Sequence, residues 1–257
     1  MCSRVSLRGR CTLCGGIALL CRSTLCRNGA LRRDGTLCRG CTLRRGCAMR
    51  GRQPVMPDRE DLVRAAQEAL FCEEVLRKGG DNVLRATLRD APVVAWTHYP
   101  TGDVYDPVSG GQWYYHCHLP PAQAEHGHYH CFVRPGGKDG PVHHLVAVGV
   151  DAHGRLQRLF TVNQWVVGDA WLEAEPSIAL LERFDMQMPQ PSYLTNRWLT
   201  AILRLYAVEI AALIRQRDAT LAGHSPAGDV ATREDRSLEV TSELRVDLLS
   251  TARALGL

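Results

Sequence analysis

The sequence predicts an α+β fold, an antiparallel meander sheet of five to six strands flanked by an N-terminal helix and by C-terminal helices. Three observations carry this prediction. A helical pattern begins at Asp58, extended segments with turns between them fill residues 92–162, and after Trp171 the apolar residues recur with a helical period. Strands joined by short turns favour a meander, and helices kept apart from the strands favour the α+β class.

The first 55 residues differ in composition from the rest. They contain twelve arginines, eight of the eleven cysteines and one acid, so they carry +11 in a chain whose total is +4. A leucine or methionine recurs every six residues from Leu7 to Met49. Three interpretations stay open: a left-handed β-helix, a targeting segment, or a translated tandem repeat upstream of a true start at Met56. The last is favoured by composition, so this segment is expected to be disordered or a mis-assigned start.

The α+β domain is expected to span residues 56–218. Asp58 is placed to cap a first helix, and Gly79–Gly80 to end it. Pro100–Asp103 has the composition of a turn. The period-two pattern and the turn residues predict five main extended segments, at residues 92–99, 111–118, 126–133, 144–150 and 156–162.

Helices are expected again after Trp171. The pattern predicts a short helix over 177–184 and a long one from a Ser192 cap to about Asp218. Residues 219–257 are predicted to form a linker and a last helix, capped at Thr232, that packs on the domain. The leucines expected on one face of that helix are Leu238, Leu244, Leu248 and Leu255. No run of eighteen apolar residues occurs, so no membrane-spanning helix is expected.

Half of the ten histidines lie in one predicted hairpin, with a loop that contains Pro120 and Pro121. Residues i and i+2 of a strand share a face, and opposite residues lie close together. If His118 pairs with His126, His116 lies opposite His128 and all five imidazoles point to the same face. The five are His116, His118, His126, His128 and His130.

These five histidines are candidate ligands of a divalent metal ion. Three neutral imidazoles can bind Zn²⁺ and leave a fourth position open, and the same array with a carboxylate suits non-haem iron. Glu125 is a candidate ligand, supporting partner or general base. The favoured function is therefore a zinc- or iron-dependent hydrolase or oxygenase, with His128 and Glu125 as candidate catalytic residues.

Three long segments carry a resemblance to a family. They are THYPTGDVYDPVSGGQWYYHCH, EHGHYHCF and RLFTVNQWVVGDAW. They resemble an uncharacterised bacterial family, a domain of unknown function, whose members share HYPxGDVYD, SGxQYYYHxH, EHGHFHxF and LFTxNxW. The likeness extends from about Asp58 to the C-terminus and leaves out residues 1–55. It implies no particular activity.

Two shorter motifs leave other functions open. Residues 126–132 are similar to the His-x-His-x-His motif of the histidine-triad nucleotide hydrolases, which implies a metal-free nucleotidyl hydrolase or transferase with His128 as nucleophile. Gly127, however, stands where that family has a larger apolar residue. Gly110, His116 and His118 are similar to the start of the first cupin motif, but Glu125 follows later than the cupin glutamate. A third interpretation is a non-catalytic module that binds a small ligand or a partner.

The charge of the chain limits the classes of partner, and its cysteines indicate the cellular compartment. The chain after residue 55 carries −7 and shows no basic patch, so a small-molecule substrate is expected and nucleic acid is not. In the predicted register Cys131 lies opposite Trp113, which puts it too far from Cys117 for a disulfide. Three unpaired thiols, counting Cys72, fit a reducing cytoplasm.

Overall fold

The computed structural model describes residues 57–118 and 125–257. All of the described residues belong to one compact unit, Arg50–Leu257. The expectations for residues 1–55, including the start at Met56, lie outside the described part. So does the loop with Pro120 and Pro121.

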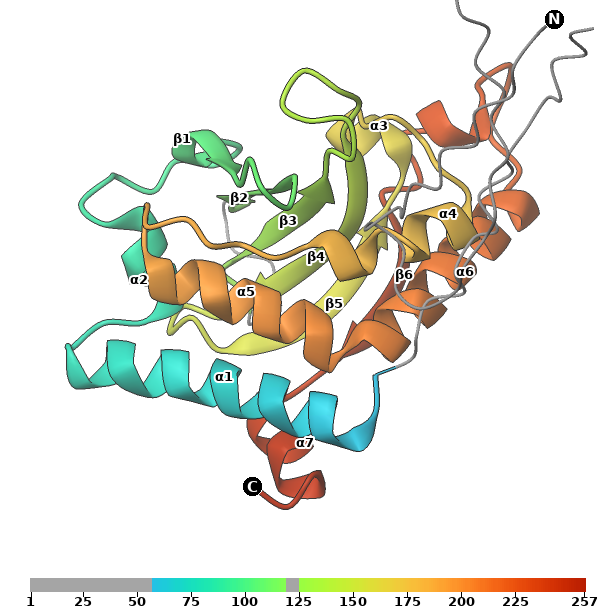
Figure 1. Ribbon diagram of the computed structural model, residues 1–257. Helices are drawn as coiled ribbons and strands as arrows, with labels where there is room; N and C mark the ends of the chain where they lie inside the picture. Colours follow the sequence, from blue (N-terminus) through green and yellow to red (C-terminus); the bar gives the residue numbers. More distant parts are fainter. Residues whose placement is uncertain (1–56, 119–124) are drawn as a thin grey trace, which may run out of the picture. The chain divides into compact units, whose positions relative to one another are not determined.

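Six strands form one antiparallel sheet in which each strand pairs with its neighbours in sequence order (Figure 1). This arrangement confirms the predicted α+β class and meander sheet. The strands are β1 (Tyr99–Tyr105), β2 (Gly111–His116), β3 (Gly127–Val133), β4 (His143–Val150), β5 (Leu156–Val162) and β6 (Val240–Arg245).

Seven α-helices are described. The carboxylate of Asp58 caps the first one at the amide of Asp61, and Gly79 follows its last turn. Ser192 caps the fifth helix in the same way, at the amide of Thr195. None of the described helices is long and apolar enough to span a bilayer. They are α1 (Arg59–Lys78), α2 (Val83–Leu88), α3 (Gln164–Val167), α4 (Ala174–Ile178), α5 (Tyr193–Leu205), α6 (Ala207–Gly223) and α7 (Leu248–Ala254).

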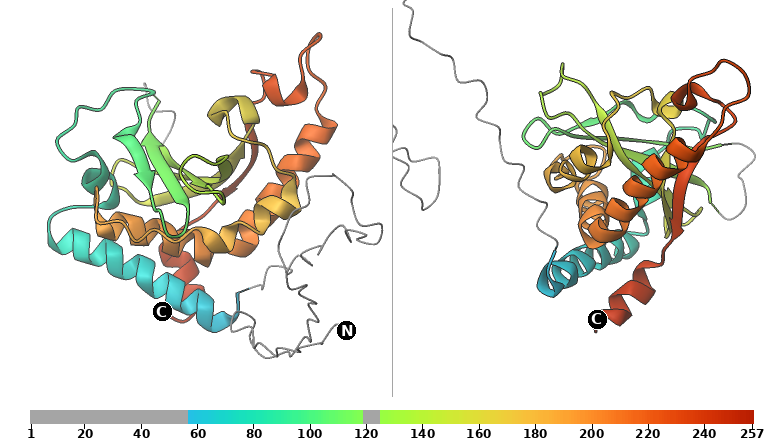
Figure 2. Two further views of the ribbon diagram at one scale, coloured as in Figure 1. Left: turned by 45° about the horizontal axis from the view of Figure 1, so that its top comes forward. Right: turned by 90° about the vertical axis from the view of Figure 1, so that its right-hand side faces the viewer.

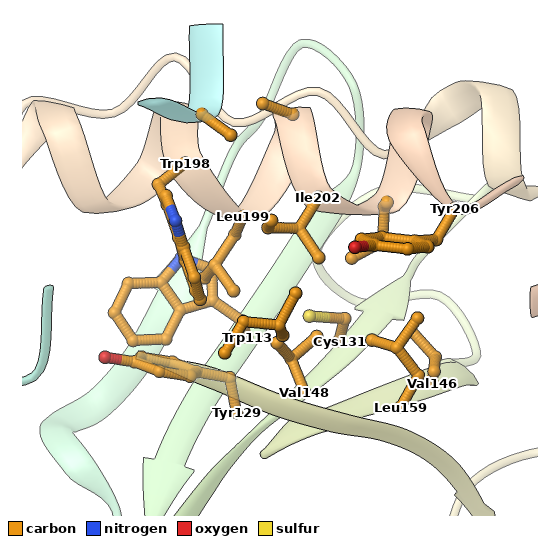
Figure 3. Close-up of a cluster of buried hydrophobic side chains, with 14 of the residues drawn as sticks. Trp113, Tyr129, Cys131, Val146, Val148, Leu159, Trp198, Leu199, Ile202 and Tyr206 are labelled. Atoms are coloured by element: carbon orange, nitrogen blue, oxygen red, sulfur yellow. The ribbon is translucent and has the colours of Figure 1, made fainter. Parts of the chain in front are cut away.

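One face of the sheet forms the main core. Helices α1, α5 and α6 lie on this side of it (Figures 1 and 2). Trp198 and Ile202 of α5 point toward Tyr129 and Cys131 of β3, all of them buried (Figure 3). The indole of Trp113 donates to the side chain of Asn196 at 2.7 Å, so its one polar atom has a partner in the core. The helix layer therefore takes one side of the sheet and leaves the other for the histidines.

The prediction of a strand over 92–99 followed by a turn is wrong. The strand begins only at Tyr99, and the expected turn lies inside it. Gly102 and Asp103 have positive φ angles of 86° and 57°, so the strand bulges and its pairing with β2 shifts between Tyr99 and Val104. The bulge lets β1 continue through residues that have turn composition.

The C-terminal helix predictions are also wrong in part. Instead of one helix over 177–184, the chain forms α4 and a short 3-10 turn at Leu181–Arg183. The long helix is divided at Tyr206 into α5 and α6. Within residues 219–257, expected to be a linker and one helix, Val240–Arg245 pairs with β5 as the sixth strand. Pairing with a free sheet edge overrides the helical leucine spacing there.

The cysteines give a first testable prediction. Cys72, Cys117 and Cys131 are buried and unpaired, as expected, and burial raises the pKa of each thiol, that of Cys72 to about 11. Because the thiolate is the reactive form, all three are expected to stay unmodified by iodoacetamide in the folded chain and to react without prior reduction once it is unfolded. Peptide mapping by mass spectrometry measures both. A bridged Cys117–Cys131 peptide would contradict the register of β2 and β3.

Candidate metal site

The histidine hairpin has the register that the sequence predicts. His116 pairs with His128, and Tyr114 pairs with His130. The core residues Trp113, Tyr115, Tyr129 and Cys131 alternate with them along the two strands and take the helix-covered face. Period two then places the histidines on the opposite face. His116, His128 and His130 are nevertheless buried, because aromatic and histidine side chains pack closely around them.

Three of the imidazoles form a group that can hold a metal ion. His116, His118 and His128 each offer one ring nitrogen, and these three nitrogens all lie within 4.8 Å of one another. The Nε2 atoms of His116 and His128 are 2.7 Å apart. The Nε2 atom of His118 is buried and has no hydrogen-bond partner. Buried polar atoms usually have a partner, so this nitrogen is available to a metal ion or to a hydrogen-bonding group.

Glu125 fixes the orientation of one of these candidate ligands. Its Oε1 atom lies 3.0 Å from Nδ1 of His128, which leaves Nε2 of that ring to face the group. Arg158 donates to Oε2 of the same carboxylate at 2.5 Å and also to Glu243 at 2.7 Å. A metal-binding histidine usually donates its second ring N–H to a carboxylate or carbonyl in this way. Glu125 is thus a supporting partner of His128 and lies outside the three-ligand group.

A glycine makes room for this carboxylate. Gly149 of β4 lies directly across from His128 on one side and Arg158 on the other. A Cβ atom at this position would lie 2.5 Å from Oε2 of Glu125, closer than real Cβ contacts come. The backbone of Gly149 is not in the left-handed region, so the requirement for glycine is one of space alone.

The site suits neutral imidazoles beside an ionised carboxylate. Burial, and after it the neighbouring His128 and His118, lower the pKa of His116 to about 3. Burial and His128 also lower the pKa of His118. For Glu125, burial acts to raise the pKa, but hydrogen bonds from His128 and Arg158 outweigh it, so the pKa falls below its usual value. At neutral pH both imidazoles hold a lone pair available to a metal ion.

His126 is not brought into the group. It lies just before β3, and its Nδ1 atom is 2.6 Å from the hydroxyl of Tyr115. Gly127 has no space for a side chain, because a Cβ atom there would collide with that hydroxyl and with the carbonyl of His116. The close packing explains why this chain departs at Gly127 from the histidine-triad motif.

His130 lies beside the group and contacts a histidine that the sequence analysis missed. Its Nδ1 atom is 3.1 Å from Nε2 of His144 on β4. Burial lowers the pKa of both rings, that of His144 to about 3. Only the alternation of side chains along β4 could have indicated His144, because its register with β3 is not visible in the sequence.

Two further residues at the site were missed because residues 92–99 were assigned to a strand. The ring centroids of Trp96 and His118 are 4.1 Å apart, although Trp96 is 65% exposed. The backbone of Trp96 has a positive φ of 65°. His98 stacks on Tyr114 at 3.6 Å, and its Nδ1 atom is 3.1 Å from a carboxylate oxygen of Asp103. A bulky residue with positive φ is uncommon and often marks a functional position.

The fold and the site together define the class of the protein. It is an α+β protein with a six-stranded meander sheet, whose face away from the main helix layer carries a three-histidine group able to hold a metal ion. The chain belongs to the family DUF6969, described as a domain of unknown function, whose model matches residues 63–246. This confirms the resemblance seen in the sequence. No curated protein and no solved structure matches the chain.

Proposed function

We propose that the protein is a zinc-dependent hydrolase whose metal ion is bound by His116, His118 and His128. The observation that carries the proposal is the convergence of three ring nitrogens within 4.8 Å, one of them buried without any partner. A cation at this place would satisfy all three nitrogens at once.

The ligand set favours zinc over iron. Non-haem iron sites of the two-histidine type need a carboxylate as the third ligand. Glu125 is the acid that contacts His128, and both of its oxygens are engaged by His128 and Arg158. Three nitrogens with an open fourth position are the ligand pattern of catalytic zinc sites.

The chain supplies orientation and access for this chemistry. Zinc with three protein ligands supplies an activated water at its fourth position. Glu125 holds the His128 ring so that Nε2 faces the site, and Arg158 holds Glu125. His116 and His128 are buried, whereas His118 is partly exposed beside Trp96. A small-molecule substrate would therefore approach past His118 and contact the Trp96 indole.

The metal-free nucleotidyl hydrolase is the second candidate, because Glu125 orients His128 as a nucleophile would require. Its attacking atom, however, is Nε2 of His128, which already lies 2.7 Å from His116 in a buried position. A binding module without catalysis would use the same surface beside Trp96. Metal content separates the first candidate from these two.

The test is elemental analysis of the untagged full chain together with thermal melting after each of Zn, Fe, Mn, Ni and Cu is added. The eight cysteines before residue 56 carry thiols of a kind that can bind zinc, so the quantity to compare is the difference from a His116→Ala chain. One extra zinc per chain in the wild type supports the proposal. The proposal is rejected if the wild type binds no more metal than His116→Ala and is stabilised no more than that variant by any of the five metals.

Replacement of Glu125 by glutamine is expected to weaken zinc binding without removing it. The amide can still accept a hydrogen bond from His128, but the negative charge and the ion pair with Arg158 are lost. Outer partners of metal ligands typically contribute about 10- to 100-fold in affinity, so Kd for zinc should rise by that factor. Competition with a chromogenic chelator measures it.

The matched control is Glu243→Gln. This residue is the other carboxylate partner of Arg158, and it lies at the exposed end of the pair. It does not contact His128, so zinc affinity is expected to stay at the wild-type value. Equal losses in the two variants would mean that the charge of the region, and not the hydrogen bond to His128, sets the affinity.

A further inference from the structure

A second buried nitrogen on this sheet face has no partner. Among the described residues, two buried side-chain nitrogen or oxygen atoms lack a hydrogen bond: Nε2 of His118 and Nε2 of His130. A metal ion held by His116, His118 and His128 would engage the first atom. It would leave the second atom, Nε2 of His130, without a partner, on a side chain that has no exposed surface. Since buried polar atoms nearly always have a partner, His130 requires one that the three-ligand site does not supply.

The orientation of the His130 ring shows where this partner would lie. Its Nδ1 atom is turned toward His144 on β4, at 3.1 Å. Nε2 lies on the other side of the ring and is therefore turned away from His144. The His130 ring centroid lies 5.1 Å from that of His116 and 4.8 Å from that of His128, and the ring is nearly perpendicular to both.

The register also keeps His130 outside the ligand group. His118 follows the His116–His128 pair along β2, whereas His130 lies on the other side of this pair, opposite Tyr114. It is accordingly not among the three histidines whose nitrogens lie within 4.8 Å of one another. Its ring therefore borders the group, 4.8 Å from that of His128 between centroids, without supplying one of the three nitrogens.

We infer that Nε2 of His130 hydrogen-bonds to the non-protein ligand at the fourth position of the metal, a water molecule or a substrate oxygen, and that His144 holds the ring in place for this contact. The inference rests on the proposed metal site. It assigns His130 to recognition of an oxygen-bearing group at the reacting centre, which fits the carbonyl or phosphoryl oxygen of a hydrolysable substrate. His144 is a positioning residue that acts only through His130.

The experiment uses the full chain with Co²⁺ in place of zinc, after accessible thiols have been alkylated in the folded state. Visible absorption of the bound Co²⁺ reports the metal, and titration with azide reports the fourth position. The variants are His130→Phe and His144→Phe. His116→Ala is the blank. His143→Gln is the matched control, since His143 neighbours His144 but donates from Nδ1 to the backbone carbonyl of Ala170 instead.

His130→Phe is expected to bind one Co²⁺ per chain, as the wild type does, and to bind azide with a Kd about tenfold higher, as expected for the loss of one hydrogen bond. His144→Phe should raise the azide Kd by a smaller factor, because His130 remains but is no longer held. His143→Gln should change neither quantity.

Each other outcome overturns the inference. Loss of Co²⁺ in His130→Phe to the level of His116→Ala would make His130 a ligand. An unchanged azide Kd would mean that His130 does not reach the fourth position. If His130→Phe does not fold, an unchanged azide Kd in His144→Phe decides against the inference in the same way. A wild type that binds no more Co²⁺ than His116→Ala would instead remove the metal site itself.

Discussion

A chain with His116 replaced by alanine is expected to lose the zinc ion that the wild type retains. Structural zinc sites with four ligands bind with about 10–16 kcal/mol, so one ligand is worth about 3 kcal/mol, or more than a hundredfold in Kd. His116 is central to the group, because its Nε2 atom is 2.7 Å from that of His128 and its ring is 5.2 Å from that of His118. Elemental analysis after dialysis, and the shift in melting temperature on adding zinc, measure the loss.

His153→Ala is the matched control for this experiment. This histidine lies on the turn after β4, is exposed and is not a member of the three-histidine group, so its removal should leave zinc content unchanged. At a free zinc concentration a hundred times its Kd, the wild type should gain about 2.7 kcal/mol of stability, and His116→Ala should gain almost none. Equal zinc content in wild type and His116→Ala would contradict the proposed site.

The second large effect is a loss of stability of the metal-free protein in mild acid. The pKa of His116 and of His144 is lowered to about 3 in the folded chain, mainly by burial, and that of His130 falls well below its usual value. In the unfolded chain each titrates near 6.5, so above that pH their contribution to stability is fully present. Below it the unfolded state binds protons that the folded state does not.

The free energy of unfolding should therefore fall from about pH 6.5 downward, by up to about 1.4 kcal/mol per pH unit for each of these histidines. At pH 5 His116 and His144 together would cost about 4 kcal/mol, a large share of the stability of a typical domain, and His130 adds to this loss. Glu73 and Asp169, whose pKa is raised by burial, act in the opposite direction but are fewer. Urea unfolding in the presence of a chelator, from pH 7.5 to pH 5, measures the slope.

His144→Phe provides the control for the pH dependence. It removes one buried titrating ring from the same sheet face and keeps a similar shape, so the slope should decrease by about one proton. A free energy of unfolding that stays constant between pH 7 and pH 5 in the wild type would show that the buried histidines do not titrate as described.

Much of the hairpin could be predicted from the sequence alone. Alternating histidines on both sides of a loop with two prolines favour a register that keeps the set on one face, because a slip of one residue would divide it between two faces. The pairing of His116 with His128 confirms the predicted register. The starts of the helices capped by Asp58 and Ser192 could also be predicted, because a cap is an interaction between residues close together in the chain. These predictions depended on residues close together in the chain.

The parts of the site that could not be predicted depend on contacts between distant segments. His144 comes beside His130 because the pairing of β3 with β4 shifts between Cys131 and Phe132, and no local pattern reveals that shift. His126 leaves the cluster because the hydroxyl of Tyr115 is its partner. Arg158 reaches Glu125 only because β5 follows β4 in the sheet.

The missing side chain at Gly149 leaves the space that the carboxylate of Glu125 occupies, so substitutions at the two positions depend on each other. A single methyl group there would occupy the place of the carboxylate while leaving every candidate ligand intact. Alanine at 149 would push the carboxylate of Glu125 away from its place between His128 and Arg158, so the residues at the two positions are expected to vary together. Coevolution of these two positions would arise from shared volume, even though one of them carries no functional group.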